Sequence, residues 1–181
     1  MSVFMSTFFS IKQACLVVLS VISFSFSNMS LASGGHNHHH GMHSPVVQTD
    51  NSFLVYKSAT CGCCKKWVSH LKSQGLAASS QDREDMSAIK DKFGIGKQYR
   101  SCHTGVTKDG YVFEGHIPAK FIAQFLQERP NQAIGLSVPG MPVGSPGMVV
   151  SNKFMAYEVL QLNKDGSTQV YAKIKNTQSQ F

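Results

Sequence analysis

The sequence predicts a mixed α/β fold, and three features of its hydrophobic pattern support that prediction. A short apolar run at 53–56 has the length of a strand, and two later segments repeat apolar residues every three or four positions, as helices do. An Asp-Gly pair at 109–110 then separates two further apolar runs, which is the pattern of a hairpin. Strands that alternate with helices in this way form a sheet flanked by helices.

The first helix follows directly from the strand at 53–56. Thr60 is expected to cap the amino end of this helix, and Gly75 ends it. A weak strand is expected at 76–80, and a second helix at 86–93 follows it. The buried face of the first helix is predicted to consist of residues at positions i, i+3, i+4 and i+7, which are Cys64, Trp67, Val68 and Leu71.

The hairpin is expected to pair 104–107 with 111–115. Pro118 suits the first position of a third helix, and Pro130 stops that helix. The buried face of the third helix comprises Phe121, Ile122, Phe125 and Leu126. The resulting order over 53–130, β-α-β-α-β-β-α, is that of a thioredoxin-like fold.

Residues 131–181 are expected to extend this core rather than to form a second domain. A loop at 138–148 contains three of the six prolines of the chain and should therefore be stiff. Two strands are predicted beyond the loop, at 154–162 and 168–174, and a turn at 164–166 joins them.

The amino-terminal third of the chain has the features of a leader and a tail. Residues 1–32 contain a single charge, Lys12, an apolar run at 14–26 and small residues before position 33, which predicts a cleaved signal peptide and a periplasmic location. The run is shorter than the roughly 20 residues that span a bilayer, so no stable membrane insertion is expected. Residues 33–52 form a polar tail with five histidines in eight positions, which predicts disorder and either weak metal capture or a solvated linker.

The charge of the chain points away from nucleic acid. The formal net charge is +7, but no basic stripe interleaved with aromatic residues accompanies it. A spread basic excess mainly favours solubility, and we expect a monomer that does not bind nucleic acid.

Three of the five cysteines stand in the segment Cys61-Gly62-Cys63-Cys64, at the start of the first helix. The partial positive charge of a helix amino terminus favours thiolates, which attack disulfides and also bind soft metals. Cys61 and Cys64 have the C-x-x-C spacing of thiol–disulfide exchange, in which Cys63 is surplus. In a metal cluster the third thiolate is an asset, because each sulfur can bridge two ions. Structural disulfides are a further alternative, although a vicinal Cys63–Cys64 bridge would be strained.

Five further residues are candidate metal ligands. Cys102 and His103 stand at the entrance to the first strand of the hairpin, which in a thioredoxin-like arrangement faces the cysteines of the first helix. His116 stands at the end of the hairpin, and Met141 and Met148 repeat Pro-Gly-Met at a seven-residue interval. Thioether sulfur selects Cu(I), and imidazole suits copper, zinc and nickel. The alternatives are a small buried residue for Cys102, structural roles for the histidines and core packing for the methionines.

In four blocks, at 55–67, 101–104, 114–118 and 138–148, the sequence resembles the periplasmic copper-resistance CopG family, and the resemblance covers 53–171. It implies a thioredoxin-like domain whose C-terminal extension contributes to a metal site. It also implies a copper cluster bridged by cysteine sulfurs, which interconverts Cu(I) and Cu(II) ahead of efflux. The ligands that it implies are Cys61, Cys63, Cys64 and Cys102, supported by methionine and histidine.

We therefore expect a periplasmic copper-binding protein of copper resistance that holds several copper ions. Whether it is also an enzyme, a copper oxidoreductase, stays open. Its expected partners are copper ions, with a periplasmic copper chaperone or an efflux system as further candidates. The alternative from another class is a thiol–disulfide oxidoreductase that acts on protein substrates through Cys61 and Cys64. A structural zinc module is opposed by the methionines, and three sulfurs in four residues fit a [2Fe–2S] cluster poorly.

Overall fold

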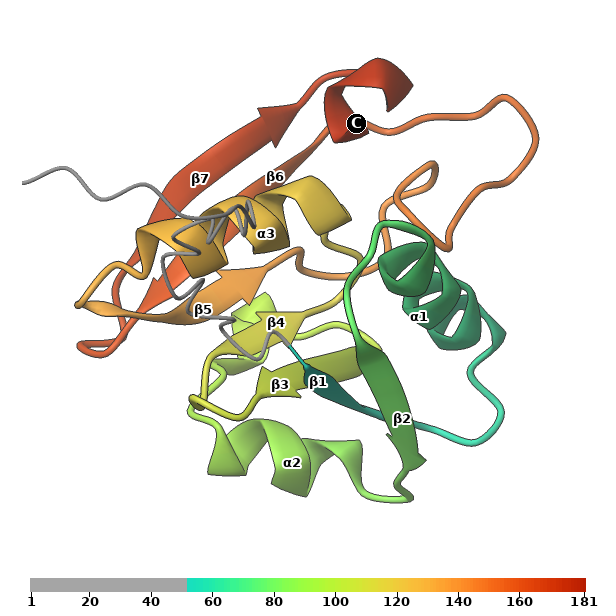
Figure 1. Cartoon of the computed structure of the whole chain (residues 1–181). Helices are drawn as coiled ribbons and strands as arrows, with labels where there is room; N and C mark the ends of the chain where they lie inside the picture. Colours follow the sequence, from blue (N-terminus) through green and yellow to red (C-terminus); the bar gives the residue numbers. More distant parts are fainter. Residues whose placement is uncertain (1–51) are drawn as a thin grey trace, which may run out of the picture. The chain divides into compact units, whose positions relative to one another are not determined.

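The computed structural model describes residues 52–181, and Figure 1 shows these residues as one sheet surrounded by helices. The predicted signal peptide at 1–32 lies outside the described residues, as does the His-rich tail except for Ser52. No helix in the described part of the chain is both long and apolar enough to cross a membrane.

Seven strands form a single sheet in the order β2-β1-β3-β4-β5-β6-β7. The strands are β1 (Phe53–Lys57), β2 (Ala78–Asp82), β3 (His103–Thr107), β4 (Val112–Glu114), β5 (Ala133–Ser137), β6 (Tyr157–Asn163) and β7 (Thr168–Ile174). The helices are α1 (Gly62–Ser73), α2 (Met86–Lys92) and α3 (Ala119–Glu128), with short 3-10 helices η1 (Lys97–Tyr99) and η2 (Thr177–Gln180). The predicted α/β class is confirmed.

The strand directions follow from the connections. β1 is parallel to β2 and antiparallel to β3, and β4 is antiparallel to β3 and parallel to β5. A helix joins each parallel pair, α1 between β1 and β2 and α3 between β4 and β5, because parallel strands need a crossover connection. β6 and β7 continue the sheet in antiparallel pairs, so the C-terminal residues extend the same sheet.

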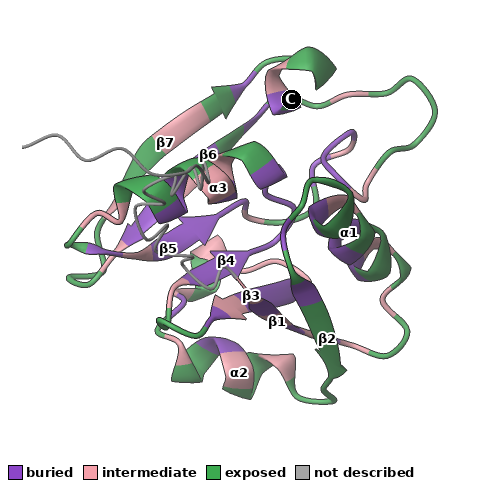
Figure 2. Cartoon of the chain, in the orientation of Figure 1, coloured by how far each residue is buried: buried purple, intermediate pink, exposed green. Residues whose placement is uncertain are grey.

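Two hydrophobic cores lie on opposite faces of the sheet. The larger core joins α1 and α3 to the sheet through Trp67, Phe113 and Phe125. The smaller core contains Ile95 and Val112. Val112 and Phe113 are neighbours in β4, and successive side chains of a strand point to opposite faces. Figure 2 accordingly shows the central strands coloured mainly as buried.

The start of each crossover helix differs from the sequence prediction. Cys61, not Thr60, caps α1, because the backbone N–H of Cys64 donates a hydrogen bond to the Cys61 sulfur at 3.3 Å. Pro118 is the N-cap of α3 rather than its first helical residue. In both cases the helix begins one residue later than the local sequence signal indicates.

Two strands also differ from the prediction. The sequence predicts no element at β5, over Ala133–Ser137, because Gly135 interrupts its short apolar run. The weakly predicted strand at 76–80 lies at 78–82 instead. Only the first residue of β2 is buried, so this edge strand carries almost no hydrophobic pattern from which a register could be predicted.

Candidate metal centre

The connection from β1 to α1 places three cysteine side chains in one helical turn. β1 ends at Lys57, and a turn closed by the bond from Cys61 N–H to Ser58 O at 3.1 Å leads into the helix. The side chain of Cys64 is fully buried on the core face of α1. The amphipathic pattern of α1 therefore directs the side chain of Cys64 toward the core. The N-cap hydrogen bond from Cys64 N–H holds the sulfur of Cys61 at the start of the helix.

Cys61 and Cys64 form a disulfide, with their Cα atoms 5.3 Å apart. This pair has the C-x-x-C spacing singled out in the sequence, whereas the metal-cluster prediction takes all four sulfurs as free. Cys63 and Cys102 are free thiols. The structure therefore records the oxidised form of the C-x-x-C pair.

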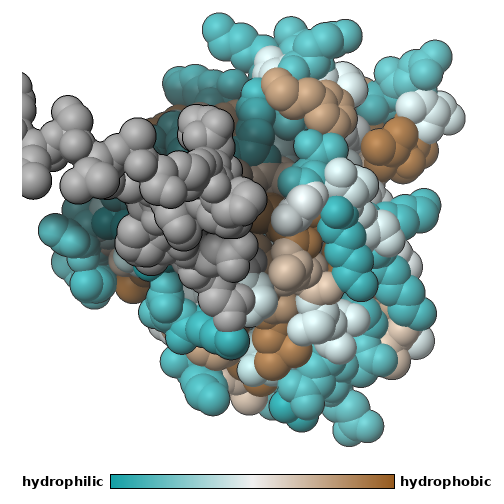
Figure 3. Space-filling model, viewed as in Figure 1, coloured by the Kyte–Doolittle hydropathy of each residue, from teal (hydrophilic) through white to brown (hydrophobic). Residues whose placement is uncertain are grey.

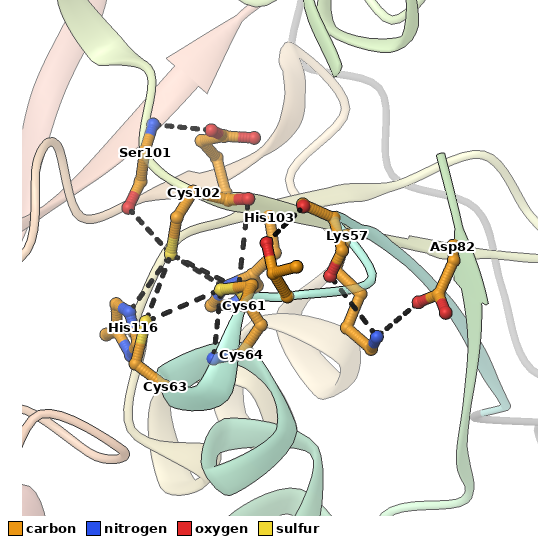
Figure 4. Close-up of a disulfide and its surroundings, with 12 residues drawn as sticks. Lys57, Cys61, Cys63, Cys64, Asp82, Ser101, Cys102, His103 and His116 are labelled. Atoms are coloured by element: carbon orange, nitrogen blue, oxygen red, sulfur yellow. Dashed lines mark hydrogen bonds and ion pairs between the residues drawn. A yellow bond between two sulfur atoms is a disulfide. The ribbon is translucent and has the colours of Figure 1, made fainter. Parts of the chain in front are cut away.

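Cys102 joins this group from the start of the β3–β4 hairpin. It precedes β3, and its sulfur lies 3.5 Å from Cys64 Sγ and 3.9 Å from Cys63 Sγ, as Figure 4 shows. Cys61 Sγ lies 3.5 Å from Cys63 Sγ. The four sulfur atoms all lie within 4.8 Å of one another. The predicted proximity of Cys102 to the helix-borne cysteines is thus present in the structure.

Two imidazole rings flank Cys102. Its sulfur lies 3.2 Å from His116 Nε2 and 3.3 Å from His103 Nδ1. His116 Nδ1 lies 2.7 Å from Pro146 O, and since a carbonyl can only accept, this nitrogen carries the proton. The lone pair of His116 Nε2 is therefore directed at Cys102, which is the tautomer that a metal-ligating histidine needs.

His103 is fully buried, and its ring lies 4.2 Å from the ring of Trp67. Within the described residues, no hydrogen-bond partner is found for His103 Nε2. Burial lowers the pKa of His103 well below its ordinary value, and electrostatic interactions with His116 and Lys90 lower it further. Burial also lowers the pKa of His116, although its bond to Pro146 opposes the shift. The imidazole rings of His103 and His116 are therefore neutral, and each can bind a metal ion through a ring nitrogen.

The thiol of Cys102 is protonated in this state. Burial, and next the charge of Cys63, raises the pKa of Cys102 to about 12. A single S–H can donate to only one of the two neighbouring imidazole nitrogens. Cys102 and the two imidazoles therefore share one proton, and a metal cation bound between them would replace that proton.

A buried ion pair that no sequence pattern predicts fixes the backbone beside Cys102. Glu114 accepts hydrogen bonds of 2.6 Å from Lys90 Nζ, from the backbone N–H of Ser101 and from Thr104 Oγ1. Both charged side chains are buried, so each needs the other. The only sequence signal was a carboxylate within an otherwise apolar strand.

The loop between β5 and β6 closes the other side of the group. Gly147 has a φ of +88°, and a Cβ there would lie 2.8 Å from Cys63 O and 2.9 Å from Trp67 N. The Ser101 hydroxyl donates to the carbonyl oxygen of Gly140. Each Pro-Gly-Met turn therefore contacts the site through its glycine. The second turn lies against Cys63 and the first against Ser101, which precedes Cys102, while the thioethers of Met141 and Met148 stay predicted ligands.

The fold and this donor set define an α/β protein with a thiol- and imidazole-rich site suited to a soft metal. Two solved structures of a copper resistance protein, described as "Copper resistance protein copG" forms 1 and 2, are similar to the chain, each with 41% sequence identity. Each covers 67% of this chain, and the similarity spans 95% and 96% of those chains, with TM-scores of 0.63 and 0.64. The chain belongs to this CopG-like copper resistance family.

Two other comparisons accompany these structures. Residues 99–148 match a family described as "Protein of unknown function, DUF411". That segment contains Cys102, both imidazoles and both Pro-Gly-Met turns, but not the cysteines of α1. No curated protein matches the chain.

Proposed function

We propose that this chain is a periplasmic copper-binding protein that holds a cysteine-bridged cluster of copper ions. The observation that carries the proposal is the convergence of four sulfur atoms within 4.8 Å of one another, with a correctly oriented imidazole nitrogen 3.2 Å from one of them. The proposed ligands are Cys61, Cys63, Cys64 and Cys102, supported by His103, His116, Met141 and Met148.

The donor types favour copper over other metals. Thiolate and thioether sulfur select Cu(I), whereas a single structural zinc would need only four ligands and rarely a thioether. Four sulfurs, two imidazoles and two methionines exceed the needs of one tetrahedral ion. A set of closely spaced thiolates can instead bridge several ions.

Copper binding by all four sulfurs requires reduction of the Cys61–Cys64 bond. Two electrons and two protons, which we assign to a dithiol reductant, convert the disulfide into two thiols while the reductant becomes a disulfide. The thiols lose their protons when they bind a metal, so uptake releases protons to solvent. Burial raises the pKa of the Cys102 thiol, so the loss of its proton is coupled to metal binding.

The mixed donor set supports a role in changing the oxidation state of copper ahead of efflux. Sulfur ligands stabilise Cu(I), and the neutral imidazoles of His103 and His116 tolerate Cu(II). The strand order β2-β1-β3-β4, with α1 crossing between the parallel pair, supports a thioredoxin-like core in which the cysteines occupy the start of the first helix. A periplasmic chaperone or an efflux system would then be the partner that supplies or removes copper.

Metal counting on the reduced protein tests this proposal. The protein is purified after expression of the full chain, reduced without oxygen and titrated with Cu(I). We expect more than one copper per chain and a lower number for the Cys102→Ser variant, which keeps the size of the side chain. One copper per chain or none would refute the cluster.

A second candidate function is thiol–disulfide exchange with protein substrates, and the Cys61–Cys64 disulfide favours it. An insulin-reduction assay separates the two functions. Strong activity that persists in Cys63→Ser would support exchange, because only Cys61 and Cys64 are needed for it. Loss of copper binding in the same variant, without any reductase activity of the parent protein, would support the copper site.

A further inference from the structure

Three of the four methionines in residues 52–181 lie in the connection between β5 and β6, at a regular interval of seven residues. They are Met141, Met148 and Met155. Met141 and Met155 are 52% and 57% exposed, whereas Met148 is only partly exposed. Met155 lies outside the Pro-Gly-Met repeat and is not among the ligands predicted from the sequence.

Backbone hydrogen bonds hold the three methionines in one folded loop. Met155 N–H donates to Val143 O at 2.8 Å, and Gly144 N–H donates to Met148 O at 2.9 Å. Met141 is two residues before Val143, a span of at most about 7 Å in a fully extended chain. The loop therefore brings its two exposed methionines to the same region, with Met148 beside them.

The position of Met155 is fixed by its neighbour. Phe154 packs against the larger hydrophobic core, and a Cβ at Gly144 would lie 2.7 Å from the ring of Phe154. Since Phe154 faces inward, Met155 is presented to solvent on an anchored backbone. Its exposure is therefore a property of a folded loop and not of a free chain end.

The same loop lies against the candidate copper centre. Pro146 accepts the hydrogen bond of His116, and Gly147 contacts the backbone of Cys63, so Met148 directly follows the two residues that touch the site. In Figure 1 this connection is drawn in orange beside α1. Val149 and Val150, which directly follow Met148, are also exposed. Figure 3 shows brown, apolar atoms toward the right-hand edge of the surface, the side on which Figure 1 draws this loop.

We propose that the thioethers of Met141 and Met155 form a surface site for Cu(I), which passes through Met148 to the cysteine sulfurs. This inference rests on the proposed copper-binding function and adds an entry route to it. Thioethers are neutral and soft, so they bind Cu(I) without releasing a proton and bind it more weakly than thiolates do. Because the outer thioether site binds Cu(I) more weakly than the inner cysteine site, transfer of Cu(I) is favourable only from the outer site to the inner one.

Binding at the outer site is tested with Ag(I), a soft monovalent ion that does not change oxidation state. The full chain is expressed with isotope-labelled methionine methyl groups, and Ag(I) is added while the Cys61–Cys64 disulfide is intact. We expect the methyl resonances of Met141 and Met155 to shift together, while that of Met86 in α2 stays in place. Leucine variants assign the resonances, because leucine keeps the apolar volume and lacks the sulfur.

Delivery to the inner site is tested by the rate at which reduced protein takes Cu(I) from a chelator. We expect Met155→Leu to slow uptake about tenfold, since an ion bound nearby is delivered intramolecularly, with no change in the final copper count. Met86→Leu should leave the rate unchanged, as should Val150→Thr, which reduces the apolar surface of the loop without removing a thioether.

The outcomes separate this inference from the copper site itself. No shift at Met155, or unchanged uptake in Met155→Leu with a normal copper count, overturns the entry route alone. Equal slowing by Val150→Thr would assign the loop to apolar docking and also overturn it. A reduced protein that takes up no copper refutes the proposed function, while the Ag(I) shifts still decide whether the outer site exists.

Discussion

His116 Nε2 lies 3.2 Å from Cys102 Sγ because the opposite nitrogen of the same ring is held 2.7 Å from the carbonyl oxygen of Pro146. The carbonyl belongs to the β5–β6 loop, and Cys102 belongs to the entrance of β3. The C-terminal extension therefore sets the tautomer and the direction of an imidazole in the core of the site.

Replacing His116 with Gln removes the oriented nitrogen donor and keeps a polar side chain of similar reach. We expect affinity for Cu(II) to fall at least about tenfold, because loss of groups that hold or orient a metal has effects of this size. Competition titrations with a chelator measure the change. His70→Gln, a histidine on α1 outside the sulfur group, is the control, and an equal loss in both variants would contradict a role for His116.

Replacing Glu114 with Gln leaves Lys90 buried without its countercharge. We expect the free energy of unfolding to fall by about 3–5 kcal/mol, the usual effect of breaking a buried pair by removing one partner. Chemical denaturation measures it. The exposed pair of Lys173 and Glu158, at 3.4 Å, provides the control, and Glu158→Gln should cost no more than about 1 kcal/mol. A similar decrease in the free energy of unfolding for the two variants would show that the buried pair stabilises the fold no more than the exposed pair does.

The stability of the metal-free protein should fall below neutral pH. Burial lowers the pKa of His70 below its ordinary 6.5, and His70 Nε2 accepts a hydrogen bond from Ala119 N–H at 3.1 Å. The unfolded chain therefore binds a proton more readily than the folded one. The associated loss of stability is absent above about pH 6.5, grows as the pH falls below that value, and levels off below the folded pKa.

His70→Gln tests the contribution of this residue, because glutamine can accept the same hydrogen bond and does not titrate. Denaturation at several pH values between 7.5 and 5 should show a shallower loss of stability in the variant (roughly the range in which histidines titrate). His103 and His116, whose pKa values burial also lowers, keep part of the slope in both proteins. An identical slope in the variant would contradict the assignment to His70.

Replacing Gly147 with Ala should disturb the metal centre as well as the fold. Its φ of +88° is unfavourable for alanine, and the added Cβ would lie 2.8 Å from Cys63 O. Gly166 has a similar φ of +81° and open space around it, so Gly166→Ala is a matched control. We expect a cost of about 1–2 kcal/mol from the backbone in both variants and a further roughly 1–3 kcal/mol from overlap in Gly147→Ala.

A spectroscopic measurement distinguishes the two glycine variants further. The charge-transfer bands of the copper-loaded protein should change in Gly147→Ala and stay as in the parent protein in Gly166→Ala. Unchanged bands in both would mean that the loop does not constrain the sulfur group.

Much of the candidate site could be predicted because local patterns place its members. The amphipathic spacing of α1 directs Cys64 inward, and the Asp-Gly turn locates the start of the hairpin, which places Cys102 opposite it. The bond between Cys61 and Cys64 was one of several open alternatives, because sequence does not specify the redox state of a thiol pair.

The remaining features depend on tertiary contacts that leave little trace in the sequence. β5 is defined by its pairing with β4 and β6, and its five residues with a central glycine carry no strand pattern. The pair of Lys90 and Glu114 joins α2 to β4, and although Glu114 opens the block at 114–118, no sequence pattern pairs it with Lys90. The contact of Gly147 with α1 likewise exists only in the folded chain.

Anomalous diffraction at the copper edge, from crystals of reduced protein loaded with Cu(I), tests the central claim most directly. We predict at least two anomalous peaks among the sulfurs of Cys61, Cys63, Cys64 and Cys102, with the disulfide absent. A single peak bound outside this group, or an intact Cys61–Cys64 bond with no copper beside it, would contradict it.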